Sequence, residues 1–275
     1  ISKELGDHQE AINCYEKAIQ INPNYAAAYN NLGNVFRELR KYNEAISCHK
    51  KAIDIQPSFA QAHTNLAFLL LLSSDLQKGF DEYEWRKKIP WNKFYKENDI
   101  RSLEWKGEDL TNKTILIFSE LGIGDIIQFA RYLYEIQDKY STTIIFRTRK
   151  KLMHLFSESK FEVISDDDPI PKHDFHKLLL SLPQIFYKET KKLPKQINYI
   201  FKNEKVFSKW KDKLSKIDGI KVGINWQGSK ITDTVTWSGD QVRFKTIPLK
   251  SFEQLFTIDK INFISLQKGD AIEQI

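Results

Sequence analysis

The chain has 275 residues, of which 41% are hydrophobic and 28% charged. This composition is typical of a folded protein long enough for two domains and excludes a disordered chain; the longest apolar run, 66–72, is too short for a membrane span. The net charge of +6 is carried by residues 89–275, with 31 Lys and Arg against 25 Asp and Glu. This excess is modest for nucleic-acid binding and fits a pocket for a phosphorylated ligand at least as well, so no nucleic-acid partner is expected.

A 34-residue period runs through the first ninety residues. Pro23 and Pro57 are one period apart, and each proline closes a predicted helix. The same spacing separates Ala11 from Ala45, Ile12 from Ile46, Ala18 from Ala52 and Ile19 from Ile53. Small residues at Gly33, Ala45 and Ala52 allow two antiparallel helices to pack closely.

This pattern resembles the tetratricopeptide repeat (TPR). The resemblance places a complete repeat at 26–59, the end of an earlier repeat at 1–25 and a degenerate third repeat at 60–90. Further repeats are expected upstream, because an isolated repeat buries too little surface to be stable. Repeat arrays present a concave face to peptides and proteins, so a protein partner is expected there. A role in extending and solubilising the adjoining domain stays open.

The cysteines Cys14 and Cys48 are also 34 residues apart. They occupy equivalent positions in successive repeats, which favours helix packing over a disulfide or a metal pair. A chain with so few cysteines has no disulfide framework, which indicates a reducing, cytoplasmic compartment.

From residue 113 onward, short apolar segments alternate with helical periodicity. Strands are predicted at 114–118, 142–146, 161–164, 178–180, 221–226 and 261–265, and helices at 126–139, 151–156, 204–217 and 252–256. This alternation predicts Rossmann-like α/β lobes after the helical repeats, a fold of the α + α/β class. The expected domains are the repeats at 1–90, a connector at 91–112, a first lobe at 113–200, and a linker helix with the start of an incomplete second lobe at 201–275.

The turn after the first predicted strand, Ser119-Glu-Leu-Gly-Ile-Gly-Asp125, is the main candidate for chemistry. Its glycines, Gly122 and Gly124, lack the third glycine of the dinucleotide fingerprint, and no acidic residue closes the second strand. An NAD enzyme is therefore not expected. By itself the motif favours a plain strand-to-helix turn in which Asp125 caps the helix.

Several short motifs follow one another in a characteristic order. They are Glu82-Tyr-Glu-Trp-Arg86, Trp105-x-Gly-Glu-Asp-Leu110, the turn 119–125 with Gln-Phe-Ala-Arg-Tyr-Leu133, Leu180-Ser-Leu-Pro183, Val222-Gly-Ile-x-Trp-x-Gly228, Lys245-Thr-Ile-Pro-Leu249 and Ser265-Leu-Gln-Lys-Gly269. From about residue 80 to the end, this order resembles bacterial TPR proteins fused to a glycosyltransferase domain of the ADP-heptose:lipopolysaccharide heptosyltransferase type.

The resemblance implies a two-lobed GT-B fold and metal-independent transfer of a sugar from a nucleotide-sugar donor to a protein or glycan acceptor, without a cofactor. The family's catalytic aspartate falls on Asp125, which implies the role of general base for the attacking hydroxyl; Glu120 is the next candidate. The implied donor or phosphate-binding residues are Gly122, Gly124, Arg243, Lys245, Gln267 and Lys268. In the second lobe, the positive charges of Arg243 and Lys245 would stabilise the departing diphosphate. No metal site is expected.

Two departures from the family qualify this expectation. The segment Asp240-Gln-Val-Arg-Phe-Lys245 replaces the usual Asn-Asp-Arg-x-Arg, and relatives continue well beyond the Gln-Lys-Gly motif. Activity is therefore expected of a longer gene product, with this chain truncated at both ends. A non-catalytic TPR scaffold with a relic α/β domain stays open as an alternative, as does a phosphoribosyl- or nucleotide-binding enzyme.

Overall fold

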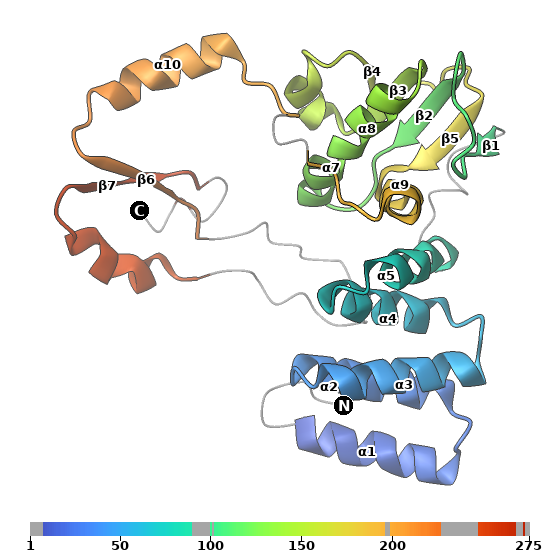
Figure 1. Cartoon of the computed structure of the whole chain (residues 1–275). Coiled ribbons are helices and arrows are strands. Elements are labelled where there is room, and N and C mark those ends of the chain that lie inside the picture. Colours follow the sequence, from blue (N-terminus) through green and yellow to red (C-terminus); the bar gives the residue numbers. More distant parts are fainter. Residues whose placement is uncertain are drawn as a thin grey trace. The chain divides into compact units, whose positions relative to one another are not determined.

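The computed structural model describes residues 8–89, 100, 102–195, 199–226, 247–267 and 272. The chain forms two compact units, Ile1–Phe201 and Lys202–Ile275. The first unit contains helical hairpins followed by a parallel sheet, and the second contains a smaller α/β element (Figure 1). TPR hairpins followed by an α/β region are the fold class that the sequence predicts.

The hairpins pack through the small residues that define the 34-residue period. They consist of α1 (His8–Ile21), α2 (Ala26–Glu38), α3 (Tyr42–Ile55), α4 (Ala60–Leu72), α5 (Leu76–Tyr83) and the 3₁₀ helix η1 (Glu84–Lys88). A Cβ atom at Gly33 of α2 would lie 2.7 Å from Cε1 of His49 on α3. Ala45 and Ala52 of α3 are fully buried. These side chains allow the close helix contact that the period predicts.

The sheet of the first unit has the strand order β1-β5-β2-β3-β4, and all neighbouring strands are parallel. Its strands are β1 (Leu103–Glu104), β2 (Thr114–Phe118), β3 (Thr143–Thr148), β4 (Glu162–Ser165) and β5 (Phe175–Leu178). The strand predicted at 114–118 is confirmed residue for residue. The strand predicted at 178–180 lies three residues earlier, and β1 falls inside the predicted connector, because two residues carry no recognisable alternation.

The helices of this unit depart further from prediction. The single helix expected at 126–139 begins at Ile123 and is divided at Ala130 into α7 (Ile123–Phe129) and α8 (Arg131–Lys139). The next segment forms a 3₁₀ helix, η2 (Lys150–Phe156). After β5 come the short 3₁₀ helix η3 (Leu179–Ser181) and α9 (Leu182–Thr190), which has a proline in its first turn.

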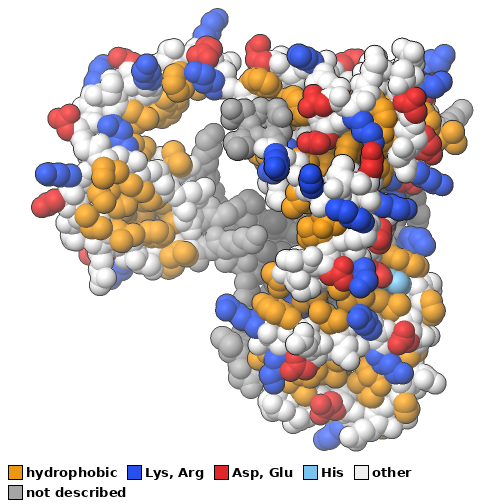
Figure 2. Space-filling model, in the orientation of Figure 1, with side chains coloured by type: hydrophobic (Ala, Val, Ile, Leu, Met, Phe, Trp, Pro, Cys, Tyr) orange, Lys and Arg blue, Asp and Glu red, His pale blue; other side chains and the backbone are white. Residues whose placement is uncertain are grey.

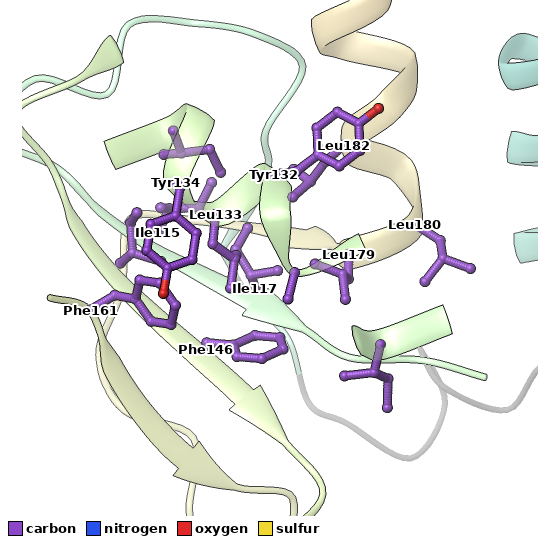
Figure 3. Packing of buried hydrophobic residues seen from close by; sticks show 14 of the residues in the cluster. Ile115, Ile117, Tyr132, Leu133, Tyr134, Phe146, Phe161, Leu179, Leu180 and Leu182 are labelled. Carbon is purple, nitrogen blue, oxygen red and sulfur yellow. The ribbon is translucent and has the colours of Figure 1, made fainter. Parts of the chain in front are cut away.

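The main core lies on one face of the sheet. Figure 3 shows Ile115 and Ile117 of β2 and Phe146 of β3 packing with Leu133 and Tyr134 of α8. The opposite face carries a second cluster of buried side chains, Leu116, Phe118, Ile145 and Leu178. Burial on both faces explains why β2 is apolar at nearly every position.

The second unit contains α10 (Glu204–Ser215) and the parallel pair β6 (Ile220–Ile224) and β7 (Ile261–Ser265), with the 3₁₀ helix η4 (Leu249–Thr257) between the strands. Strands predicted at 221–226 and 261–265 are therefore found within one residue or two of their expected places. Figure 2 shows apolar side chains at the surface of this unit. The exposed apolar residues of the unit include Trp210 and Phe256.

Candidate functional site

The β2–α7 turn, residues 119–125, lies at the carboxyl edge of the parallel sheet. From β2 the chain proceeds to β3 and β4 on one side, and then returns to place β5 on the other side of β2. The strand order thus reverses between β2 and β5. In open α/β sheets, ligands bind at such a switch point, outside the carboxyl ends of the strands. The turn that the sequence singles out is therefore at the place where this fold would hold a ligand.

The backbone of this turn is held in a conformation that few residues adopt. Leu121 has φ of 60°, in the left-handed region, and its carbonyl accepts a hydrogen bond of 2.5 Å from Arg149 Nη2. A non-glycine residue in this region costs of order 1 kcal/mol or more and persists only where its surroundings impose it. Strained residues of this kind cluster at functional sites.

Asp125 is half-buried in the first turn of α7. Its Oδ2 accepts a 3.0 Å hydrogen bond from the backbone N–H of Gly122, the N-cap residue. Its Oδ1 accepts no hydrogen bond from the residues that the structure describes. One carboxylate oxygen therefore caps the helix, as the sequence alone favours, while the other could accept a proton.

The two glycines of the turn have different surroundings. A Cβ atom at Gly122 would lie 3.0 Å from Asp125 Oδ2, so a side chain there would press on the cap. At Gly124 a Cβ atom would meet no atom within 4 Å, and the residue does not have a positive φ. Neither packing nor backbone conformation requires glycine at position 124. Its lack of a side chain leaves the exposed start of α7 open to close approach by a ligand.

A buried arginine from the helical region joins the two loops that flank the switch point. The side chain of Arg86 on η1 is 0% exposed and donates to both carboxylate oxygens of Glu120, at 2.5 and 3.3 Å. The same guanidinium donates to Ser181 Oγ at 2.9 Å. Glu120 also accepts from the backbone N–H of Leu180, at 3.3 Å. The loops after β2 and β5 are thereby tied together.

Two neighbouring carboxylates stabilise the positive charge of Arg86. Burial by itself would lower the pKa of Arg86, but the carboxylates of Glu120 and Glu84 outweigh burial and raise it. Burial likewise opposes ionisation of Glu84, whereas Arg86 and Lys87 outweigh it and lower the pKa of that carboxyl group. Because Glu120 is engaged by Arg86 and by Leu180, Asp125 is the better placed of the two predicted bases.

The remaining predicted site residues belong to the second half of the chain. Gln267 follows β7, is nearly buried and accepts a hydrogen bond of 3.1 Å from the backbone N–H of Trp226, just beyond β6. It therefore connects the carboxyl ends of the two strands. Arg243, Lys245 and Lys268 lie outside the residues that the structure describes.

Sequence reasoning missed Arg86, Ser181 and Arg149 as parts of the site. Arg86 and Ser181 do belong to motifs that the resemblance includes, Glu82–Arg86 and Leu180–Pro183, and this membership is the signal that could have indicated them. Arg149 follows β3 and stands in no motif, so only the parallel pairing of β2 with β3 brings it to the turn.

A second polar cluster surrounds a cavity of about 600 Å³ bordered by η1, β1, β5 and α9. Glu104 accepts hydrogen bonds from Lys87 Nζ at 2.7 Å and Lys177 Nζ at 2.9 Å. Burial would raise the pKa of Glu104, but these two lysines outweigh it and bring the pKa to about 2. The innermost charges of the cavity thus pair with one another, which makes it a weaker candidate than the turn.

Two general features complete the description. Within the described ranges, His, Cys, Asp and Glu residues form no group of three or more that could hold a metal ion. No helix in the same part of the chain combines the length and apolar character needed to cross a bilayer.

Comparison with known proteins supports the reading of the N-terminal region. Residues 2–39 match the family described as TPR repeat, and residues 26–59 match the family described as tetratricopeptide repeat. The protein FlbA of Caulobacter vibrioides is 22% identical over 294 residues, which include 98% of this chain and 48% of FlbA. The chain therefore spans about half the length of this relative.

Solved structures with detectable likeness include the crystal structure of MamA, 26% identical over 30% of this chain and 48% of that chain, with a TM-score of 0.29. Another is the first TPR of Spaghetti (RPAP3), solved with the HSP90 peptide SRMEEVD, which is 24% identical over 35% of this chain and 76% of that chain, with a TM-score of 0.30. The family matches place TPR repeats in residues 2–59 of this chain, and the described residues that follow include an α/β region with a five-stranded parallel sheet.

Proposed function

We propose that the β2–α7 turn is part of a glycosyltransferase site, at which the whole protein transfers a sugar from a nucleotide-sugar donor to a hydroxyl group of a protein or glycan. The observation that carries this proposal is the position of Gly122–Asp125 at the carboxyl edge of the sheet, beside the switch point. The segment contains a glycine with open space around it, Gly124, and a half-buried carboxylate, Asp125. The order of motifs from residue 80 onward supports it.

Asp125 is the proposed general base. A hydroxyl that attacks an anomeric carbon must lose its proton as the new bond forms, and a carboxylate oxygen within reach can take it. Oδ2 is occupied by the Gly122 amide, so Oδ1 is the atom assigned to the proton. The open position at Gly124 would allow the donor or the acceptor to approach the backbone.

The donor would be held mainly by the second half of the chain. Arg243, Lys245 and Lys268 are proposed to stabilise the negative charge that develops on the departing diphosphate. Gln267 lies at the carboxyl ends of β6 and β7, which is the edge where ligands bind in parallel sheets. No metal ion is required in this scheme.

The experiment compares the chain with its Asp125→Asn variant. Release of nucleoside diphosphate is measured with a panel of UDP-, GDP-, ADP- and CMP-sugars (CMP-sugars release the monophosphate), and donor binding is measured separately by calorimetry. Asparagine can still accept the Gly122 hydrogen bond but cannot take a proton. We expect folding and donor binding to persist while turnover falls by about 10²–10⁴-fold, the usual loss when a general base is removed.

The matched control is Asp138→Asn, the same exchange at an exposed position of α8, which should leave turnover unchanged. Near-normal turnover of Asp125→Asn with a lowered melting temperature would show that Asp125 is only a helix cap. The same test should be repeated on a longer gene product, since the chain spans about half of FlbA.

A non-catalytic interaction protein is the second candidate, and the repeats themselves favour it. Helices α1 and α3 each bury only three residues, and Tyr25 and Tyr42 are exposed at the starts of α2 and α3. Exposed aromatic side chains are common anchors at protein interfaces. If no nucleotide sugar binds to the chain or is turned over, this candidate is the one to pursue.

A further inference from the structure

The third helical hairpin, α4 with α5 and η1, differs from the repeats that precede it. Helix α4 buries residues on all its sides, from Ala60 and Ala62 to Leu69 and Leu70, and it carries more large apolar side chains than α2, its counterpart in the preceding repeat. A helix that is buried all round is enclosed by other elements. Its neighbours are α3, α5 and η1, and its residue Ala67 belongs to the main core of the α/β sheet.

Hydrogen bonds also attach α5 of the hairpin to α9 of the α/β region. Gln184 Nε2 of α9 donates to Asp81 Oδ1 of α5 at 2.9 Å, and Lys191 Nζ donates to Gln77 Oε1, also at 2.9 Å. Tyr83, the last residue of α5, is buried in the same core as Ala67. The hairpin therefore packs on the α/β region with both its apolar and its polar residues, and this face is closed to other proteins.

We infer that this hairpin is the support of the β2–α7 turn and that Arg86 is the positioning residue through which it acts. The guanidinium makes two hydrogen bonds to Glu120, one to Ser181 Oγ, one to the carbonyl of Tyr83 and one to Glu84. A planar fork with five donors can satisfy all of these acceptors at once, whereas an ammonium group cannot. Arginine is therefore specifically required at position 86.

The effect reaches the proposed base through the backbone. Glu120 immediately precedes the left-handed residue Leu121, whose carbonyl is held from the other side by Arg149. With Glu120 fixed by Arg86 and Leu121 fixed by Arg149, Gly122 and Asp125 are presented in one orientation. Loss of the arginine should release the turn, because a strained backbone relaxes once its surroundings no longer impose it.

Hydrogen–deuterium exchange tests this directly, without reference to catalysis. Arg86→Lys keeps the positive charge but removes the fork. We expect exchange in the peptides that cover 119–126 to accelerate at least about tenfold, the equivalent of one lost hydrogen bond to a charged group. Exchange in 26–59 should stay unchanged. Arg131→Lys is the matched control, because Arg131 donates to the carbonyl of Gln128 and to Tyr199 Oη and lies over the ring of Tyr199, all of which are outside residues 119–126.

A gentler variant covers the case in which Arg86→Lys does not fold. Ser181→Ala removes one acceptor of the guanidinium and should accelerate exchange in 119–126 by about threefold to tenfold. Unchanged exchange in this segment in either folded variant would overturn the inference, as would equal acceleration in 26–59.

A kinetic readout connects the inference to the proposed function, on which only this part depends. In nucleotide-sugar turnover, a misplaced base should lower kcat much more than it raises KM, whereas general destabilisation would leave the kcat of the folded fraction unchanged. If the parent chain turns over no donor, the proposed function fails while the exchange result still decides the role of Arg86.

Discussion

Among single residues, His49 shows how the repeats accommodate buried polar groups. Its Nδ1 lies 3.2 Å from Asn30 Oδ1, which also accepts a 3.0 Å hydrogen bond from Asn65 Nδ2. The other ring nitrogen, Nε2, is buried without a partner in the described part of the chain. Burial, followed by the charge of Arg37, lowers the pKa of His49 to about 3. The folded repeats therefore hold this imidazole in its neutral form.

The stability of the repeats should consequently depend on pH through His49. In the unfolded chain the histidine binds a proton below about pH 6.5, whereas in the folded chain it does so only below about pH 3. The unfolded state thus binds more protons between these values, so stability is full above about pH 6.5 and falls as the pH drops toward 3. The slope contributed by this residue approaches about 1.4 kcal/mol per pH unit.

Denaturant unfolding of the chain and of His49→Gln at about pH 7 and about pH 5 measures this contribution, because glutamine stays polar and does not titrate. The variant should lose less stability than the parent on acidification. His154→Gln, at an exposed position of η2, should behave like the parent. Parallel loss in the parent and in His49→Gln would mean that His49 does not titrate differently on folding.

At the level of elements, the segment 91–112 is more than the connector that its sequence indicates. It contributes β1 to the sheet and Trp105 to the main core, where the indole is 0% exposed and its Nε1 donates to the carbonyl of Glu108 at 2.8 Å. The ring also lies edge-on to Tyr140 and close to Phe186. The residues after β1 therefore close the core from the edge of the sheet.

Replacing Trp105 with alanine should destabilise the first unit by about 3–5 kcal/mol, the usual cost of deleting a large buried aromatic side chain. Trp210→Ala is the matched control, since the indole of Trp210 on α10 is 50% exposed, and it should change stability far less. Both are measured by denaturant unfolding followed by near-ultraviolet circular dichroism. Similar losses of stability in the two variants would show that burial of Trp105 does not contribute specially to the stability of this core.

The contrast between β2 and α9 explains which elements were predictable. The residues of β2 form a continuous apolar run because both faces of the sheet are covered, and such a run is visible in the sequence. Helix α9 begins with Leu182-Pro183. Its few apolar residues can be identified as a buried face only once the helix is seen to pack on α5 and on the main core. Short elements whose shape is imposed by their neighbours leave a weak local pattern.

The residues of the candidate site also fall into a predictable group and an unpredictable group. The turn 119–125 follows from a strand, two glycines and an aspartate that are adjacent in the sequence. The hydrogen bonds of Arg86 to Glu120 and to Ser181 join residues 34 and 95 positions apart. No local pattern encodes such pairs, because they depend on the strand order that places β5 beside β2.

For the molecule as a whole, the sequence pattern changes abruptly at residue 90, but the structure has no matching boundary there, because residues of the repeats share a core with the α/β region. The first compact unit extends from the repeats to Phe201, and one hydrophobic core includes Ala67 and Tyr83 together with residues of β2 and α8. Helices α1 to α3 stand outside this core. Repeats contact only their neighbours, so the array can be shortened from its outer end at little cost to the sheet.

Two truncations test this division. A chain that begins at residue 60 retains α4, α5 and η1, and we expect it to unfold cooperatively with near-native near-ultraviolet circular dichroism. A chain that begins at residue 90 lacks Ala67 and Tyr83 of the main core and also Arg86, the ion-pair partner of Glu120. Deletion of one large buried aromatic side chain such as Tyr83 costs about 3–5 kcal/mol by itself, a large part of the stability of a typical domain. The shorter chain should therefore lose its cooperative transition. If instead it melts as sharply and at the same temperature as the longer chain, the α/β region folds by itself and the third hairpin is an ordinary repeat.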